Sequence, residues 1–166
     1  MSAFAAMLAV LLSIGLLCAR RIETALWLCG LQGLCAAVTL GAGGSVFAPA
    51  VLVLNAVAVP YFAWRVLVGA AQSAPSPRSW LLGAAALVVA AAAFGGFGNG
   101  IAFGIGVVLL GLLLAAQASP MIGLLSAQNG VVLVAAAISD LPPSSVLAAA
   151  IPLLPAILLS YAWLRR

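Results

Sequence analysis

The chain has almost no ionisable side chains. It contains no lysine and no histidine, and its charged residues are six arginines and two acids among 166 residues. General acid–base catalysis needs a titratable group, and metal or haem sites need clusters of histidine, cysteine or carboxylate. Nucleophilic triads, phosphate-binding loops and dinucleotide-binding motifs are missing as well. These absences argue against an enzyme with its own active site, and they predict no catalytic, metal-binding or cofactor-binding residue.

What the chain does contain is apolar surface. Its composition is 67% hydrophobic and 5% charged, and its mean hydropathy is +1.35. A soluble domain needs far more charge on its surface. We therefore expect an all-α integral membrane protein. The arginines are too scattered to form a nucleic-acid-binding patch. The uncharged stretch 1–18 precedes its arginines, which favours a retained first transmembrane helix over a signal peptide.

Three cysteines lie in apolar runs. Cys18, Cys29 and Cys35 form no C-x-x-C pair and have no histidine to complete a metal site. We expect them to be buried thiols that pack as small hydrophobic side chains.

Apolar segments long enough to cross a bilayer recur along the chain. We predict seven helices in one transmembrane domain, residues 1–166, with four helices in 1–95 and three in 100–166. Their expected ranges are 2–19, 23–41, 46–68, 79–95, 100–118, 120–139 and 145–164. Clusters rich in glycine, proline or serine separate most of these segments. In particular, Ser119-Pro120 predicts a tight turn between the fifth and sixth helices.

The arginines predict the orientation of these helices. Arg20 and Arg21 follow the first helix, Arg65 and Arg78 flank the loop after the third, and the last two residues are arginines. Cytoplasmic loops carry the excess of basic residues in membrane proteins. All six arginines fall on the cytoplasmic side if the N-terminus is outside and the C-terminus is cytoplasmic.

A polar group interrupts the uncharged run 121–138. Ser126, Gln128, Asn129 and Gly130 lie near the centre of that run. Polar side chains at such a depth are costly unless paired, and they are functional candidates by default. An amide donates and accepts hydrogen bonds but does not titrate near neutral pH. The group can therefore orient or line a pathway, but it cannot by itself relay a proton.

Other polar side chains are predicted at similar depths. Gln32 lies at the centre of the second helix, Asn55 near the centre of the third, and Gln117 near the inner end of the fifth. Each can make an interhelical hydrogen bond or line a hydrated path. Gly96, Gly100 and Gly104 recur every four residues, a spacing typical of closely packed membrane helices.

The stretch Gly123–Leu133, followed by Leu141-Pro142 and a last apolar helix, resembles hydrogenase-4 component E. That family typically reads G-L-L/F-x-x-E-N-G-I-F-L at this point. Its last three helices are similar to the NuoK subunit of complex I and the MrpC subunit of Mrp antiporters. Leu28–Leu34 also resembles the second helix of the family. The similarity covers the chain loosely and residues 117–146 most specifically.

The departures from the family concern its carboxylates. Gln128 replaces the family's mid-membrane glutamate, and the last helix carries Pro152 and Pro155 where the family has further acids. These prolines should kink that helix and free backbone carbonyls. In the family, the carboxylates are thought to belong to a proton path. The resemblance therefore implies a subunit that keeps the fold and has lost the titrating groups.

The resemblance also implies a place for the chain. We expect an accessory subunit of a complex I-like assembly in the bacterial cytoplasmic (inner) membrane, such as a group 4 hydrogenase, formate hydrogenlyase or Mrp-type complex. Its partners would be lipids and antiporter-like subunits of the NuoL, NuoM and NuoN type, and it would support proton or sodium translocation. The alternatives are a stand-alone transporter or channel for a neutral solute, and a membrane assembly scaffold.

Overall fold

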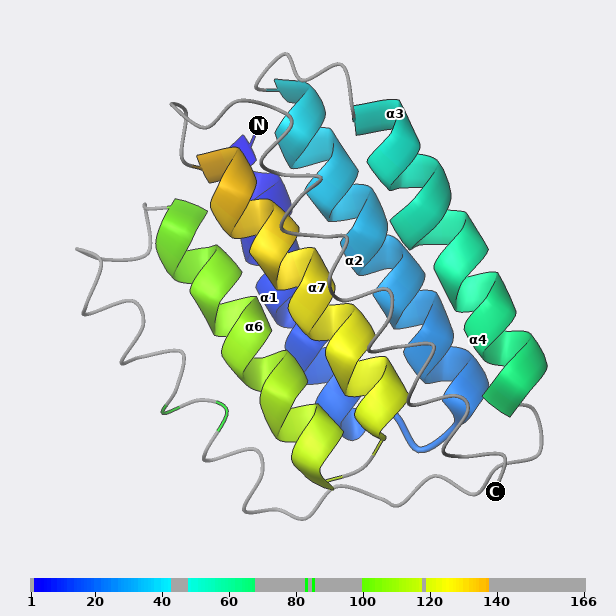
Figure 1. Cartoon of the computed structure of the whole chain (residues 1–166). Coiled ribbons are helices and arrows are strands. Elements are labelled where there is room, and N and C mark those ends of the chain that lie inside the picture. Colours follow the sequence, from blue (N-terminus) through cyan, green and yellow to red (C-terminus); the bar gives the residue numbers. More distant parts are fainter. Residues whose placement is uncertain are drawn as a thin grey trace.

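The computed structural model describes residues 2–42, 48–67, 83, 85, 100–117 and 119–137. These residues are helical apart from short connections, and none of them forms a strand. The helices are α1 (Ser2–Cys18), α2 (Ile22–Ala42), α3 (Ala48–Val51), the π-helix η1 (Leu52–Ala58), α4 (Val59–Leu67), α6 (Gly100–Gln117) and α7 (Pro120–Ala137). Because α3, η1 and α4 follow one another without a break, they form a single continuous rod (Figure 1).

Five of the predicted helical segments coincide with these elements. Each observed end lies within two residues of the predicted one, and the two-residue differences are at the start of α3 (46 predicted, Ala48 observed) and the end of α7 (139 predicted, Ala137 observed). The predicted turn at Ser119-Pro120 is confirmed, since α6 ends at Gln117 and α7 begins at Pro120. The segments 79–95 and 145–164 lie outside the described residues, except that Gly83 and Ala85 are helical. The count of seven helices therefore stays a prediction.

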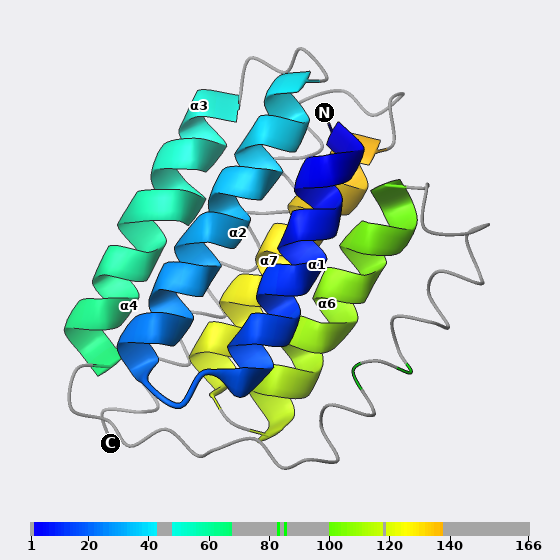
Figure 2. The same ribbon diagram turned by 180° about the vertical axis from the view of Figure 1, so that it is seen from behind.

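Four helices form the centre of the described bundle. α7 lies between α6 and α2 on one side (Figure 1), and α1 lies between the same two helices on the other side (Figure 2). The rod of α3, η1 and α4 packs along the outer edge of α2. As a result, α2 contacts α1, α7 and the rod, and it connects the first half of the described chain with the last.

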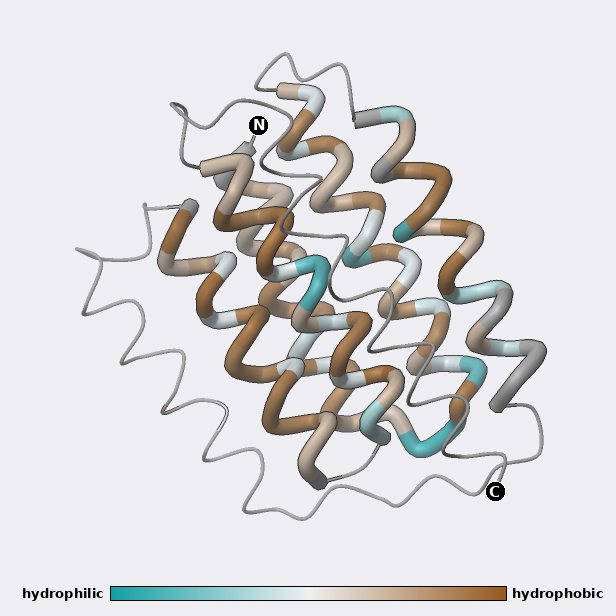
Figure 3. Tube along the Cα trace, viewed as in Figure 1, coloured by the Kyte–Doolittle hydropathy of each residue, from teal (hydrophilic) through white to brown (hydrophobic). Residues whose placement is uncertain are grey.

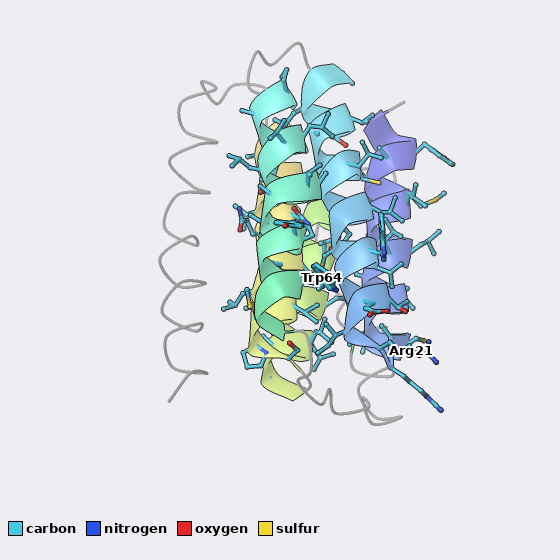
Figure 4. All side chains as sticks on the ribbon, turned by 90° about the vertical axis from the view of Figure 1, so that its right-hand side faces the viewer. Arg21 and Trp64 are labelled. Carbon is cyan, nitrogen blue, oxygen red and sulfur yellow. The ribbon has the colours of Figure 1, made fainter. Side chains whose placement is uncertain are left out.

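The helices run in the alternating directions that the sequence predicts. α1, α4 and α6 run one way along the bundle, and α2 and α7 run the other way (Figures 1 and 2). Arginines gather where α1 and α4 end and α2 begins. Arg20 and Arg21 are exposed in the connection between α1 and α2, and Arg65 lies near the end of α4. Figure 4 shows the side chain of Arg21 extending from this end.

Two apolar clusters fill the bundle, one above the other. One contains Ala5, Val10, Cys35, Leu40, Phe103, Val107, Val132 and Leu133 among others. The second contains Leu16, Leu17, Leu26, Cys29, Leu110, Leu114, Ile122 and Leu125 among others. Along α1, α2 and α7, buried Ser13, Gln32 and Gln128 fall between the residues of the two clusters. A polar layer therefore crosses the bundle where the apolar clusters meet.

Glycines bring α6 and α7 into backbone contact. A Cβ atom added to Gly111 would lie 2.5 Å from the backbone nitrogen of Ala127. One added to Gly130 would lie 2.6 Å from the nitrogen of Val108, and one on Gly104 would lie 2.7 Å from the nitrogen of Val134. Only glycine permits so close an approach. The close packing predicted around Gly104 is therefore present, and it holds α7 at a fixed position against α6.

Within the part of the chain that the structure describes, two helices, α2 and α7, are long and apolar enough to cross a membrane. Shorter apolar helices cover 4–18, 52–61 and 101–116. The outward faces are apolar as well, and the most exposed large hydrophobic side chains are Trp27 (76%), Phe4 (67%), Val57 (62%) and Val53 (59%). Tyr61 and Trp64, with ring centroids 6.3 Å apart, lie on the outward face of α4, where Figure 4 labels Trp64.

The prediction of three buried cysteines is correct for two of them. Cys29 and Cys35 are buried in the bundle, whereas Cys18 is exposed. Cys18 is the last residue of α1, next to the connection that carries the exposed arginines. Its neighbours Leu16 and Leu17 point into the core, so at 100° per residue its own side chain is turned outward.

Candidate functional site

The site is centred on α7, which contributes three buried polar side chains within four residues. Ser126, Gln128 and Asn129 are exposed by only 1%, 4% and 2%. Adjacent residues of an α-helix project about 100° apart, so Gln128 and Asn129 reach different neighbours. Gln128 Nε2 donates a hydrogen bond to Asn55 Oδ1 of η1 at 3.2 Å. Asn129 Nδ2 donates to the backbone carbonyl of Cys29 in α2 at 3.3 Å.

Gln32 forms a second polar cluster, between α2 and α1. Its side chain is fully buried, and its Nε2 donates to Ser13 Oγ at 2.6 Å and to the carbonyl of Ala9 at 3.2 Å. The hydroxyl of Ser13 in turn donates to the same carbonyl at 3.0 Å. Both amide protons of Gln32 are therefore used within the protein. This arrangement matches the first of the two roles expected for Gln32, an interhelical hydrogen bond.

The two clusters belong to one level of the bundle. Gln32 lies one turn along α2 from Cys29, whose carbonyl accepts the bond from Asn129. In Figure 3 the hydrophilic segments of α2, η1 and α7 lie at a similar height, with apolar segments on either side. The structure therefore joins Gln128 directly to Asn55, ties the neighbouring Asn129 to α2, and places Gln32 one turn further along α2.

A π-helix presents Asn55 to this site. η1 runs over Leu52–Ala58 and is followed by Pro60. Proline has no backbone N–H, so Pro60 cannot bond the carbonyl of Ala56 four residues earlier. In the five-residue spacing of a π-helix the same proline cannot bond the carbonyl of Asn55, so one backbone bond is lost in either spacing. Pro60 therefore interrupts the regular bonding just after η1, and π-helical turns are frequent at functional sites.

Glycines on α2 let the π-helix come close. A Cβ atom added to Gly33 would lie 2.6 Å from the carbonyl of Asn55, and one on Gly30 would lie 3.0 Å from the carbonyl of Ala56. Any larger residue at Gly33 would push η1 away from α2. The two glycines therefore set the distance at which Asn55 meets Gln128.

A small cavity adjoins the amide pair. Its walls come from α2, η1, α4 and α7, and its lining residues are Cys29, Asn55, Val59, Pro60, Leu125, Gln128 and Asn129. The polar part of the wall consists of three primary amides and the thiol of Cys29, which contacts the carbonyl of Ile122 at 3.9 Å.

Three buried oxygens at this level have no hydrogen-bond partner. They are Gln32 Oε1, Ser126 Oγ and Gln128 Oε1. An unpaired buried acceptor costs about 1–3 kcal/mol, so three of them at one level are an unusual concentration. All three oxygens can accept a hydrogen bond, and the hydroxyl of Ser126 can also donate one.

The chemistry of the site is that of neutral hydrogen bonding. No group of three or more metal-ligating side chains occurs within the described ranges. The amides neither titrate near neutral pH nor act as nucleophiles. The arrangement can orient a small polar molecule or tie helices together.

Three predicted residues remain. Gln117 is the last residue of α6, and Pro152 and Pro155 lie outside the described residues. Three contributors were not predicted: Ser13, the carbonyl of Cys29, and Pro60. Only Pro60 left a signal in the sequence, as a proline inside a helical segment.

Comparisons of the chain with protein-family models, with curated proteins and with solved structures found no match.

Proposed function

We propose that this chain is an accessory membrane subunit of a complex I-like assembly. The observation that carries the proposal is the buried amide layer of Gln128, Asn129 and Asn55, set halfway along a bundle with apolar outer faces. The sequence around Gln128 resembles hydrogenase-4 component E, in which a glutamate occupies this position. The proposal joins that resemblance to the neutral chemistry of the site.

The outer surface supports immersion in a membrane. Large apolar side chains such as Phe4, Trp27 and Val57 are exposed, which is stable in lipid and costly in water. Arg20 and Arg21 are exposed at one end of the bundle, where Arg65 also lies. With that end in the cytoplasm, the N-terminus of α1 faces outside, in accord with the distribution of basic residues in membrane proteins. A bacterial cytoplasmic membrane is the proposed location.

The proposed role is packing and polar lining, without proton carriage by this chain itself. An amide at position 128 keeps the hydrogen bond to Asn55 and removes the titrating proton. Proton or sodium movement in the parent complex would then pass through its antiporter-like subunits. The exposed leucines of α6, Leu109 and Leu112, give this helix an apolar face for lipid or for such a subunit.

Co-purification tests the proposal. The tagged chain is extracted from native membranes in mild detergent, and the proteins that elute with it are identified by mass spectrometry. We expect antiporter-like subunits together with hydrogenase-type or quinone-reducing subunits. Recovery of the chain alone at every loading, as a monomer or homo-oligomer, would refute the proposal.

A matched pair of variants tests the role of the amide. Gln128→Leu removes the bond to Asn55, whereas Leu34→Gln adds an amide at an exposed position of α2. We expect Gln128→Leu to reduce the amount of assembled complex several-fold while the turnover of each assembled complex stays within about twofold. Loss of ion movement with assembly intact would show instead that Gln128 acts in translocation.

A second candidate function rests on the cavity beside the amides. Neutral polar groups that line a cavity halfway along the bundle are also what a small transporter or channel for a neutral solute would use. Liposomes that contain only this protein would then show saturable solute flux. Gln128→Leu should abolish that flux, and Leu34→Gln should leave it unchanged. A pure assembly scaffold would give neither flux nor a turnover effect.

A further inference from the structure

The hydrogen-bonding groups of the Gln128–Asn55 pair are only partly used. Each primary amide has one oxygen acceptor and an NH2 donor. The contact between them joins Gln128 Nε2 to Asn55 Oδ1 and leaves Gln128 Oε1 without a partner. If the oxygen and nitrogen of both amides were exchanged, Asn55 Nδ2 would donate to Gln128 Oε1. The NH2 group of Gln128 would then be unpaired instead of its oxygen. In either orientation the buried end of Gln128 requires one more partner.

The surroundings restrict what that partner can be. The cavity next to the pair is lined by the apolar side chains of Val59, Pro60 and Leu125 and by the amides. Among the described residues no acid belongs to its wall, and a cation bound there without one would be an uncompensated buried charge, which is strongly unfavourable. The occupant is therefore neutral, and the amides select a molecule that both donates and accepts hydrogen bonds.

The size of the cavity gives a further restriction. The space that it offers is about that of a single water molecule, which is stable in a buried site when it has two to four polar partners. Asn55 can supply a donor through its Nδ2, because its contact with Gln128 uses only its oxygen. Gln128 can supply an acceptor, because the last torsion of a glutamine side chain is soft and the amide can turn towards the cavity.

We propose that the cavity between α2, η1, α4 and α7 is a binding site for one water molecule. The water donates a hydrogen bond to the carbonyl oxygen of Gln128 and accepts one from Asn55 Nδ2. It completes the hydrogen bonding of the amide pair, and it makes the contact between α7 and the rod a water-bridged one. The inference needs neither the membrane complex nor the partners proposed above, because it depends only on the packing of described residues.

Magnetisation transfer from water to side-chain amides tests this site. Proton-detected solid-state NMR is recorded on the full chain in lipid bilayers, and transfer is measured at the NH2 groups of Asn55, Gln128 and Gln32. Gln32 is the internal control, because Ala9 and Ser13 already accept both of its protons. The exposed guanidinium of Arg21 is the positive control.

We expect transfer at Asn55 to be several-fold stronger than at Gln32. Transfer at Asn55 as weak as at Gln32, with a normal signal at Arg21, would overturn the proposal. A failure of the co-purification experiment leaves this result untouched, so the two proposals are separable.

A pair of valine substitutions places the water in the cavity. Val59→Leu adds a methylene to the cavity wall, whereas Val57→Leu adds the same group at an outward position of η1 that is 62% exposed. We expect Val59→Leu to reduce the transfer at Asn55 several-fold and Val57→Leu to leave it unchanged. Equal transfer in the two variants would show that water reaches Asn55 by another route, and the cavity site would be wrong.

Discussion

Gln128 shows how one side chain decides the chemistry of this bundle. It is buried, it bonds Asn55, and it adjoins a cavity, all of which a glutamate could also do. The amide differs because it carries no charge at any physiological pH. The polar layer is therefore compatible with an apolar surrounding at every pH, whereas a carboxylate there would cost the fold a buried charge once it ionised.

The substitution Gln128→Glu makes this difference measurable. Burial favours the protonated, neutral form of the new carboxyl group, so the variant is most stable at low pH and loses stability as the pH rises. We expect a loss of about 2–4 kcal/mol, relative to the unsubstituted chain, between about pH 4 and pH 9. Thermal unfolding in detergent, followed by circular dichroism across this range, measures it.

Thr24→Glu is the matched control for that substitution. Thr24 is exposed in the first turn of α2, next to the arginine-bearing connection. A carboxylate there stays hydrated and lies near the helix N-terminus, where negative charge is favourable. The control should show no loss with rising pH. A pH-independent Gln128→Glu variant would mean that position 128 is open to water, against the burial described above.

At the scale of elements, the hairpin of α6 and α7 is the most closely packed unit. Its small residues place one backbone directly on the other, for example at Gly111 and Ala127. In lipid there is no hydrophobic force between helices, so close packing of this kind contributes much of the association. It also fixes the rotation of α7, and with it the directions in which Gln128 and Asn129 point.

Two glycine-to-alanine substitutions separate packing from helix propensity. Gly111→Ala places a Cβ 2.5 Å from the backbone of Ala127, whereas Gly15→Ala meets only a side-chain atom of Leu28 at 3.4 Å. We expect Gly111→Ala to destabilise the bundle by about 1–3 kcal/mol. Gly15→Ala should be neutral or stabilise it by up to about 1 kcal/mol. Equilibrium unfolding in mixed detergent measures both, and equal effects would show that the hairpin does not pack as described.

The sequence predicted the elements better than their contacts. The end of α6 and the start of α7 were predictable because Ser119-Pro120 favours a turn, and Arg20 and Arg21 marked the end of α1. The positions of Gln32, Asn55 and Gln128 near the middle of their helical segments were predictable by counting residues. Their hydrogen-bond partners were not, because a helix that is apolar on nearly every face gives no indication of which face meets which neighbour.

The π-helix shows why contacts were harder to predict. The wider turn of the π-helix rotates Asn55 away from the direction it would have in an α-helix. In the sequence, only Pro60 indicated an irregular helix at this point. The acceptor carbonyl of Cys29 is a backbone group, which no sequence pattern marks. The exposure of Cys18 followed from its place at a helix end and not from its apolar neighbours.

At the scale of the whole molecule, the described helices make an apolar body with a polar layer halfway along it. The layer separates two apolar clusters, and the exposed Arg20 and Arg21 lie at one end. The proposed location would put the arginines at the cytoplasmic surface and the amides near the midplane. Our central proposal is therefore that the amide layer lies at the centre of a bilayer.

The exposed face of α2 allows that claim to be measured directly. Thr24, Leu31 and Val38 are all exposed and lie seven residues apart, so they follow one face of the helix at intervals of about 10 Å. Leu31 adjoins Gln32 in the polar layer. Each of the three is replaced in turn by a spin-labelled cysteine, with Cys18, Cys29 and Cys35 changed to alanine. The accessibility of each label to oxygen and to a water-soluble nickel chelate then gives its depth.

The account predicts that the label at Leu31 is the deepest of the three, with the label at Thr24 near the lipid headgroups. The label at Val38 should lie between the centre and the opposite surface. A label at Leu31 as accessible to the nickel chelate as the label at Thr24 would contradict the account, because the amide layer would then not lie inside a bilayer.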